Sequence, residues 1–265
     1  MKKIVLLAMS AFMSRASMAQ GKVTKSLVLY YSQTGMTKYV AEEIQKNLGA
    51  DIQSIELDKP YDGDFQQTIA RCQQERQNGT LPTLKPFMVD VKKYDTIYLG
   101  YPIWFGTYAP PVEALIKQED FAGKTIVPFC TFGSGGLEVS VSDLKKNLPK
   151  AKVADEGYGV RTARKSAVAS EVKAFFSKNK APEQPYSQQK PVTEAEKKIF
   201  DEACSNYQFP LGTPETVGKR TTKTSTDYKY TVKSRGMDGK EGTSTILVTV
   251  SNKQGAKAEF TRVIR

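Results

Sequence analysis

The chain has 265 residues, with 39 Lys and Arg against 28 Asp and Glu, a formal net charge of +11 and no histidine. Its length suits one large or two modest domains, and 39% hydrophobic residues are enough to form a core, which excludes a wholly disordered protein. The lack of histidine excludes Ser-His-Asp and Cys-His catalysis and His-ligated zinc, and the three cysteines have no CxxC spacing.

The first nineteen residues have the pattern of a secretory signal peptide. Lys2 and Lys3 provide the positive start, residues 4–13 are apolar, and residues 17–19 (SMA) form a small-x-small cleavage site. An N-terminal core segment is the alternative. The pattern favours export to a bacterial periplasm, with a mature chain that begins at Gln20. No later run approaches the roughly 20 apolar residues that a membrane helix needs, so no membrane span is expected.

Residues 20–180 are predicted to form one α/β domain. Strand-like runs occur at residues 26–31, 51–57, 96–101 and 125–131, with a weaker one at 152–155. Helical spacing separates or follows them at residues 38–48, 65–77, 111–117, 139–147 and 167–178. Strands that alternate with helices favour parallel pairing through right-handed crossovers. We therefore expect a doubly wound, five-stranded parallel sheet.

The pattern changes after residue 180. Residues 181–191 contain three prolines and are predicted to form a linker. Thr193 and Glu196 have the spacing of a capping box at the start of a helix over residues 193–204. Four strand-like runs follow, at about 216–223, 227–234, 244–251 and 256–264. Residues 192–265 are predicted to form a small α+β domain of unknown function, with only an outline similarity to cystatin-like modules.

The segment between the first strand and the first helix is rich in hydroxyl groups. Its residues are Ser32, Gln33, Thr34, Gly35, Met36 and Thr37. The first N–H groups of a helix lack intrahelical partners, and the helix dipole favours an anion there. The loop has neither GxxxxGK[ST] nor GxGxxG, so neither an NTPase nor a dinucleotide enzyme is indicated. Phosphate binding and ordinary N-capping explain these residues equally well.

Residues 28–37 (VLYYSQTGMT) also match the phosphate-loop signature of the flavodoxins at every fixed position. Residues 49–51, 94–97, 100–104 and 123–131 extend the likeness, so that residues 26–180 resemble an exported bacterial branch of that family. The resemblance implies a flavodoxin-like fold with FMN as cofactor, its phosphate held by residues 32–37. Met36, where Asn is common, and the basic charge balance depart from the family pattern.

The resemblance places the flavin ring between two further loops. The loop after the third strand would supply an aromatic plate and backbone hydrogen bonds through Pro102, Ile103, Trp104, Phe105 and Gly106. The glycine-rich loop after the fourth strand would contribute Thr131, Phe132, Gly133, Ser134, Gly135 and Gly136. Trp104, the one tryptophan, is expected to stack on the ring. The alternatives are core packing for Trp104 and a flexible strand–helix turn for the glycines.

Together these features predict an exported FMN-binding flavodoxin-like protein that acts in electron transfer with an unidentified redox partner. One alternative is an FMN-dependent oxidoreductase that reduces quinones or other small acceptors. Another is a binding module that has lost the flavin and uses its C-terminal domain. No side chain is predicted to be a catalytic acid, base or nucleophile, or a metal ligand. Basic residues occur in short scattered pairs such as Lys92-Lys93, which does not indicate a nucleic-acid groove.

The cysteines are expected in different environments. Cys130 is predicted to be buried in the fourth strand and Cys204 to lie on the apolar face of the C-terminal helix. Cys72 lies in a polar helical stretch (ARCQQER) and is predicted to be exposed.

Overall fold

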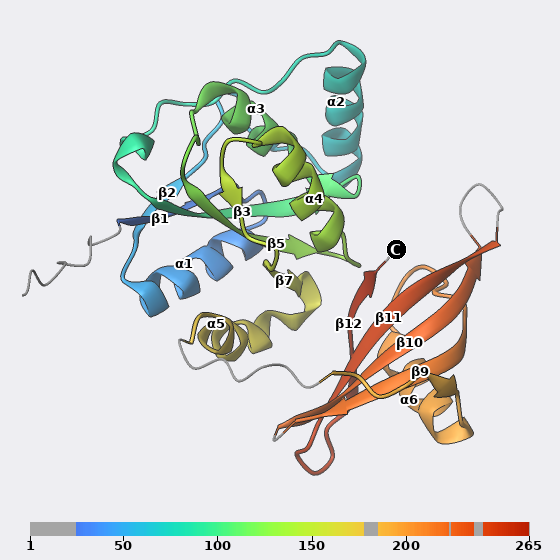
Figure 1. Ribbon diagram of the computed structural model, residues 1–265. Coiled ribbons are helices and arrows are strands. Elements are labelled where there is room, and N and C mark those ends of the chain that lie inside the picture. The colour runs from blue at the N-terminus through green and yellow to red at the C-terminus, as the bar shows by residue number, and fades with distance from the viewer. Residues whose placement is uncertain (1–24, 178–184, 223, 236–240, 265) are drawn as a thin grey trace, which may run out of the picture.

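The computed structural model describes residues 25–177, 185–222, 224–235 and 241–264. The predicted signal peptide at residues 1–19 and residues 181–184 of the predicted linker lie outside the described residues. Two units are visible in Figure 1. We call residues 25–177 the α/β unit and residues 185–264 the C-terminal unit.

A parallel sheet forms the centre of the α/β unit. Its strand order is β2-β1-β3-β5-β6, from β1 (Ser26–Tyr30), β2 (Asp51–Ser54), β3 (Thr96–Trp104), β5 (Thr125–Phe132) and β6 (Lys152–Val153). The short β4 (Thr107–Tyr108) pairs antiparallel with β3, and β7 (Tyr158–Arg161) pairs parallel with β5. The predicted doubly wound parallel sheet is confirmed.

Two short strands, β6 and β7, occupy the fifth position, where one strand was predicted. β6 pairs with residues 125–126 of β5, and β7 pairs with residues 129–132. The Ile126 carbonyl accepts a hydrogen bond from the Ala154 N–H (2.8 Å), just after β6. Alternate residues of a strand direct their backbone groups to the same side, so the backbone nitrogen of Pro128 also faces the fifth strand position. Proline has no N–H to donate to a ladder. The interruption at Pro128 therefore accounts for the split.

Helices cover both faces of this sheet (Figure 1). Successive strand residues point to opposite faces, so Leu27 and Leu29 join one core cluster and Val28 and Tyr30 join the other. The first cluster packs against α2 (Phe65–Gln77), α3 (Pro110–Gln118) and α4 (Leu137–Asn147). The second packs against α1 (Met36–Leu48) and α5 (Val168–Phe176).

Cys72 is fully buried, so the prediction that it is exposed is wrong. Helix α2 is polar over most of its surface, but Thr68 and Cys72 lie four residues apart and form its buried face. The buried face of α2 consists of two small side chains one helical turn apart. Two such residues do not produce an apolar periodicity that the sequence could show. Cys130 is buried and Cys204 is partly buried, as predicted.

The C-terminal unit packs one helix on an antiparallel sheet. Helix α6 (Glu194–Cys204) lies on one face of a sheet of order β12-β11-β10-β9-β8. Its strands are β8 (Lys190–Pro191), β9 (Thr213–Thr221), β10 (Ser225–Arg235), β11 (Glu241–Ser251) and β12 (Ala258–Ile264). The capping box is present: Thr193 and Glu196 each bond the backbone N–H of the other. β8 falls within the predicted linker, whose C-terminal end therefore belongs to this sheet.

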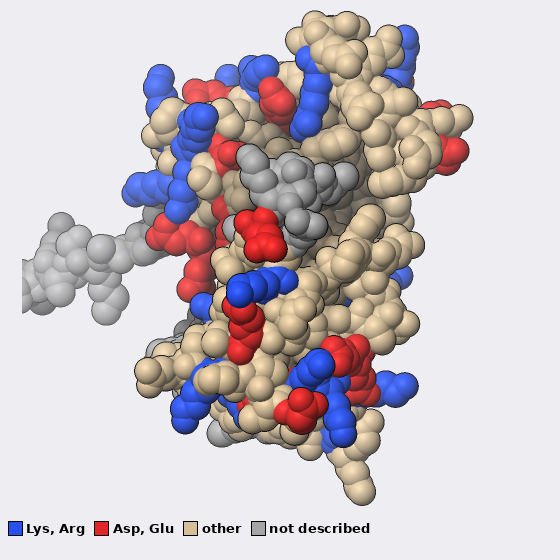
Figure 2. Space-filling view, turned by 90° about the vertical axis from the view of Figure 1, so that its right-hand side faces the viewer, with Lys and Arg blue, Asp and Glu red and all other residues tan. Residues whose placement is uncertain are grey.

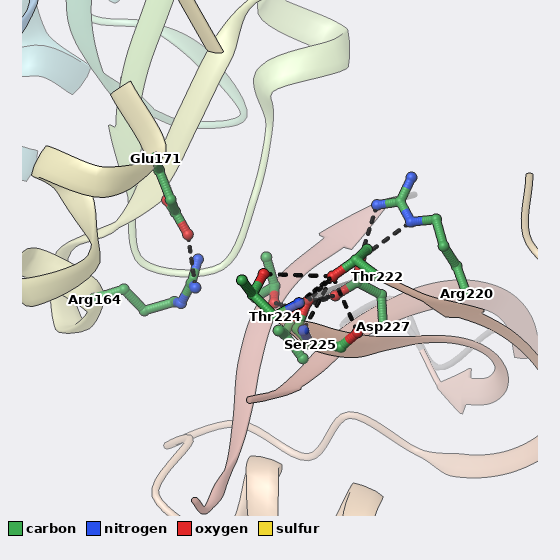
Figure 3. Close-up of polar contacts among 9 residues, drawn as sticks. Arg164, Glu171, Arg220, Thr222, Thr224, Ser225 and Asp227 are labelled. Carbon is green, nitrogen blue, oxygen red and sulfur yellow. Dashed lines mark hydrogen bonds and ion pairs between the residues drawn. The ribbon is translucent and has the colours of Figure 1, made fainter. Parts of the chain in front are cut away.

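Polar contacts close the β9–β10 hairpin (Figure 3). Arg220 and Asp227 form an ion pair across the two strands, with 2.9 Å between guanidinium and carboxylate. The Thr222 hydroxyl accepts hydrogen bonds from the N–H groups of Thr224 and Ser225 (3.2 and 3.0 Å). Because these side chains bond to one another and to the backbone of the hairpin, we infer that they stabilise its turn.

The surface carries both signs of charge. Figure 2 shows basic and acidic side chains interspersed over one face of the molecule, in keeping with the scattered basic pairs of the sequence. Among the described residues, no helix is long and apolar enough to cross a membrane.

Candidate functional site

The three predicted site loops meet at one edge of the parallel sheet. The register aligns Tyr30 of β1 with Gly100 of β3, and Pro102 of β3 with Thr131 of β5. The loops that follow these strands therefore leave the sheet at its carboxyl edge. Strand order reverses between β1 and β3, because β2 lies on one side of β1 and β3 on the other. Open α/β sheets bind ligands at such a switch point.

The loop after β1 contains a buried hydroxyl without a partner. Within the described chain, Ser32 Oγ is one of two buried side-chain polar atoms that form no hydrogen bond. A buried, unsatisfied hydroxyl costs about 1–3 kcal/mol, so its presence suggests a polar ligand. Gly35 precedes α1 with a φ of 87° and has no side chain to cap the helix. An added Cβ at Gly35 would have nothing within 4 Å. The loop thus has an open surface above free helix N–H groups.

The other residues of this loop hold it in place. The Gln33 side-chain amide donates to the Tyr61 carbonyl and to the Thr68 hydroxyl, at 3.0 Å each. The Met36 side chain is buried in the core, and Thr37 is buried beside β5. The Thr37 and Thr131 hydroxyls lie 2.8 Å apart and share a hydrogen bond. Ser32 and the exposed Thr34 are therefore the side chains that remain available to a ligand.

The loop after β3 is a tight β-hairpin, because β3 continues to Trp104 rather than ending at Tyr101 as predicted. Trp104 pairs with Thr107 of β4 across a two-residue turn. Both turn residues have positive φ, 52° at Phe105 and 87° at Gly106, as a type I′ turn requires. Phe105 is the one non-glycine residue of the described chain with positive φ. Phe105 is 46% exposed, and the Arg76 guanidinium lies 4.5 Å from the centroid of its ring.

The Trp104 indole packs against two tyrosines. Its ring meets Tyr31 and Tyr61 edge-on, with centroid distances of 5.9 and 5.3 Å, and it is half-buried against the core. Burial raises the pKa of both tyrosines well above the usual value, so both phenols stay protonated. Trp104 therefore has core contacts in this structure, and its predicted stacking on a flavin stays a prediction.

The two predicted ring loops line one cavity of about 600 Å³, within the range of about 300–1,000 Å³ that is typical of small-molecule pockets. The α/β unit contributes Ile103, Phe105, Gly106 and residues 132–136. The C-terminal unit contributes residues 206–209 and Val263. Trp104 and residues 32–37 are absent from the described residues that line this cavity.

Sequence reasoning missed Arg161 and the residues from the C-terminal unit. The Arg161 guanidinium donates to the carbonyls of Gly133 and Phe260, at 2.8 and 2.9 Å. Burial lowers the pKa of Arg161. Tyr207 and Phe209 form an aromatic pair just after α6, which is the only sequence signal that could have drawn attention to them. No local pattern reveals which surface such a pair faces.

The described chain contains no group of acidic residues and cysteines that could hold a metal ion. The arrangement can hold an anion at the loop after β1 and a flat molecule in the cavity. These features make it a candidate binding site for a ligand with an anionic group and a flat ring.

A family model described as flavodoxin matches residues 25–188. A flavoprotein structure from Bacteroides uniformis is 29% identical and covers 57% of this chain and 98% of that one, with a TM-score of 0.50. A structure from Bacteroides eggerthii is 28% identical (58% and 99% covered, TM-score 0.49). A Lactobacillus acidophilus flavoprotein in complex with FMN is 25% identical (56% and 97% covered, TM-score 0.46). No curated protein matches the chain.

Proposed function

The chain belongs to the flavodoxin family over residues 25–188, and from this premise we propose that it binds FMN and acts in electron transfer outside the cytoplasm. The buried, unpaired Ser32 Oγ in the loop between β1 and α1 is the observation that carries the proposal. A phosphate there would accept hydrogen bonds from this hydroxyl and from helix N–H groups. The residues present therefore fit the anionic end of FMN.

The cavity suits the other end of the ligand. Its walls combine the partly exposed Phe105 with residues 132–136 of the glycine-rich loop, and a flat heterocycle needs both aromatic and backbone contacts. The Thr37–Thr131 hydrogen bond ties the phosphate loop to the strand that leads into the ring loop. The chain's own part is to bind, orient and shield the ligand, while bound FMN supplies the electron transfer.

A flavin titration of the full chain tests this proposal. Apoprotein would be titrated with FMN and with riboflavin, followed through Trp104 fluorescence and flavin absorbance. FMN is expected to bind at least about tenfold more tightly, because one hydrogen bond to a charged group contributes about 1.5–3 kcal/mol. Equal affinity for the two flavins would contradict phosphate recognition. Binding of neither would favour the alternative of a module that has lost its flavin.

An FMN-dependent reductase of small acceptors is a second candidate. The cavity between the two units favours it, because a small molecule can enter a space of about 600 Å³ that a redox protein cannot. The measurement is the oxidation of NADH or NADPH by the FMN-loaded chain in the presence of a quinone. Quinone-dependent turnover would support a reductase, and its absence would favour a protein partner.

Export is proposed from the leader pattern alone. Protein isolated from the native host is expected to have an intact mass that corresponds to a chain beginning at Gln20. Retention of Met1 would contradict export by this route.

A further inference from the structure

We propose that the C-terminal unit forms a fixed wall of the flavin cavity: strand β12 docks on the glycine-rich loop and places Tyr207 and Phe209 against the flavin ring. The proposal rests on FMN binding as set out above. It gives the C-terminal unit a role in holding the cofactor, and it predicts that ring affinity depends on residues from both units.

The first observation is direct backbone pairing between the units. The Val263 N–H of β12 donates to the Ser134 carbonyl (2.7 Å), and Val263 forms a parallel bridge with Gly135. An added Cβ at Gly135 would lie 2.2 Å from the Val263 carbonyl oxygen. Real Cβ atoms do not approach backbone so closely, so this contact requires glycine at position 135. The glycine-rich loop is therefore a docking site as well as a cavity wall.

Charged side chains fix the same contact. Arg161 bonds the Gly133 carbonyl and the Phe260 carbonyl at once, and its guanidinium lies 4.1 Å from the Phe260 ring centroid. Arg164 joins Glu171 of its own unit (2.7 Å, Figure 3) to Glu259 of β12 (3.1 Å), and its side chain is 12% exposed. Partly buried arginines with fixed partners hold geometry better than exposed pairs do.

A third tie lies beside the cavity. Arg262 of β12 pairs with Glu138 at the start of α4, with 3.1 Å between guanidinium and carboxylate. Glu138 also lines the cavity. Contacts from β12 thus reach the α/β unit at the glycine-rich loop, at the end of β7 and just after it, and on α4. Together they fix the orientation of the C-terminal unit over the cavity.

The cavity wall that results is aromatic. Tyr207 and Phe209 of the C-terminal unit line it together with Phe105 of the hairpin. Phe209 is 66% exposed and Phe105 is 46% exposed. Large exposed aromatic side chains that converge on one cavity indicate a ligand that covers them. A flat aromatic ring buries such surfaces best, which is the chemistry of the flavin ring.

Substitution of Phe209 tests the wall directly. In the full chain, Phe209→Ala is expected to raise the dissociation constants of FMN and riboflavin by the same factor, about three- to tenfold, because the lost contact is with the ring. Phe65→Ala is the matched control, since Phe65 is 75% exposed on α2 and does not line the cavity. An unchanged affinity for both flavins in Phe209→Ala would overturn the proposal.

A second variant tests the docking. Gly135→Ala should push β12 away, so iodide should quench the fluorescence of bound riboflavin more strongly than in the native chain. Gly242→Ala is the control, because its added Cβ would have nothing within 4 Å. If Gly135→Ala does not fold, Glu259→Lys opposes Arg164 outside the cavity and should give the same increase. Unchanged quenching in the variant that folds would overturn the docking. Failure of the native chain to bind either flavin would instead contradict the proposed function.

Discussion

At the scale of single residues, the hydroxyl groups of the loop after β1 divide into two kinds. Ser32 Oγ is buried without a partner, whereas the Thr37 hydroxyl shares a hydrogen bond with the Thr131 hydroxyl. The sequence pattern predicts Ser32, Thr34 and Thr37 alike as phosphate donors. The distinction depends on Thr131, which lies 94 residues further along the chain, so no local pattern could have predicted it.

Thr37→Val and Thr34→Val should therefore differ in stability. Thr37→Val leaves the buried Thr131 hydroxyl without a partner and should lower the free energy of unfolding by about 1–3 kcal/mol. Thr34 is exposed, so Thr34→Val should change the free energy of unfolding by no more than about 0.5 kcal/mol. Urea unfolding of the flavin-free chain measures both. Equal losses in the two variants would contradict the assignment.

Trp104 is a second residue whose contacts depend on the fold. Trp104→Ala removes the ring that packs edge-on against Tyr31 and Tyr61, and it should destabilise the flavin-free chain by about 2–3 kcal/mol. Trp104→Phe keeps an aromatic ring there and should lose less than half as much. Thermal unfolding without flavin provides the comparison. A flavin-free Trp104→Ala chain as stable as the native one would mean that the indole contributes no core packing.

At the scale of elements, apolar periodicity predicted the helices and strands because most of them bury one regular face. Helix α2 spans the predicted residues 65–77, and α1 begins two residues before the predicted start. The errors have local physical causes: Pro128 divides the fifth strand position into β6 and β7, and the Phe105–Gly106 turn lets β3 continue to Trp104. The capping box at Thr193 was predicted because its two residues are close in sequence.

Glu196 makes helix α6 sensitive to pH. Burial alone would raise its pKa, but hydrogen bonds from Lys219 and from the backbone and hydroxyl of Thr193 outweigh burial and lower the pKa to about 2. A carboxyl group with a lowered pKa stabilises the fold above its unfolded pKa of about 4.5, and this stabilisation is lost as pH falls towards 2.

Glu196→Gln should therefore lower the free energy of unfolding by about 1–2 kcal/mol at pH 7 and flatten its decline between pH 4.5 and pH 2. Glu215→Gln is the matched control, since Glu215 pairs with Lys233 on the surface (2.8 Å), where such pairs contribute little. Denaturant unfolding across this pH range measures both. A decline as steep in Glu196→Gln as in the native chain would contradict the assignment.

At the scale of the whole molecule, the sequence predicts alternating strands and helices in its first part and one helix followed by strands in its second part. The structure has two separate sheets, one in each part. The contact between the units could not be predicted. It depends on the backbone approach of Val263 to Gly135 and on Arg161 and Arg164, which lie about 100 residues from their partners in β12. The predicted linker gave no indication of this docking, because the composition of a linker does not specify which surfaces of the two units meet.

The central claim is that the loop after β1 holds the phosphate of FMN, and Ser32→Ala tests it most directly. The substitution removes a hydroxyl that is unsatisfied without ligand, so the flavin-free chain should be as stable as the native one or more stable. FMN should bind about 10- to 100-fold more weakly, because a hydrogen bond to a charged group is lost. Riboflavin, which has no phosphate, should bind the variant and the native chain within about twofold of each other. Equal weakening of both flavins, or unchanged FMN affinity, would contradict the claim.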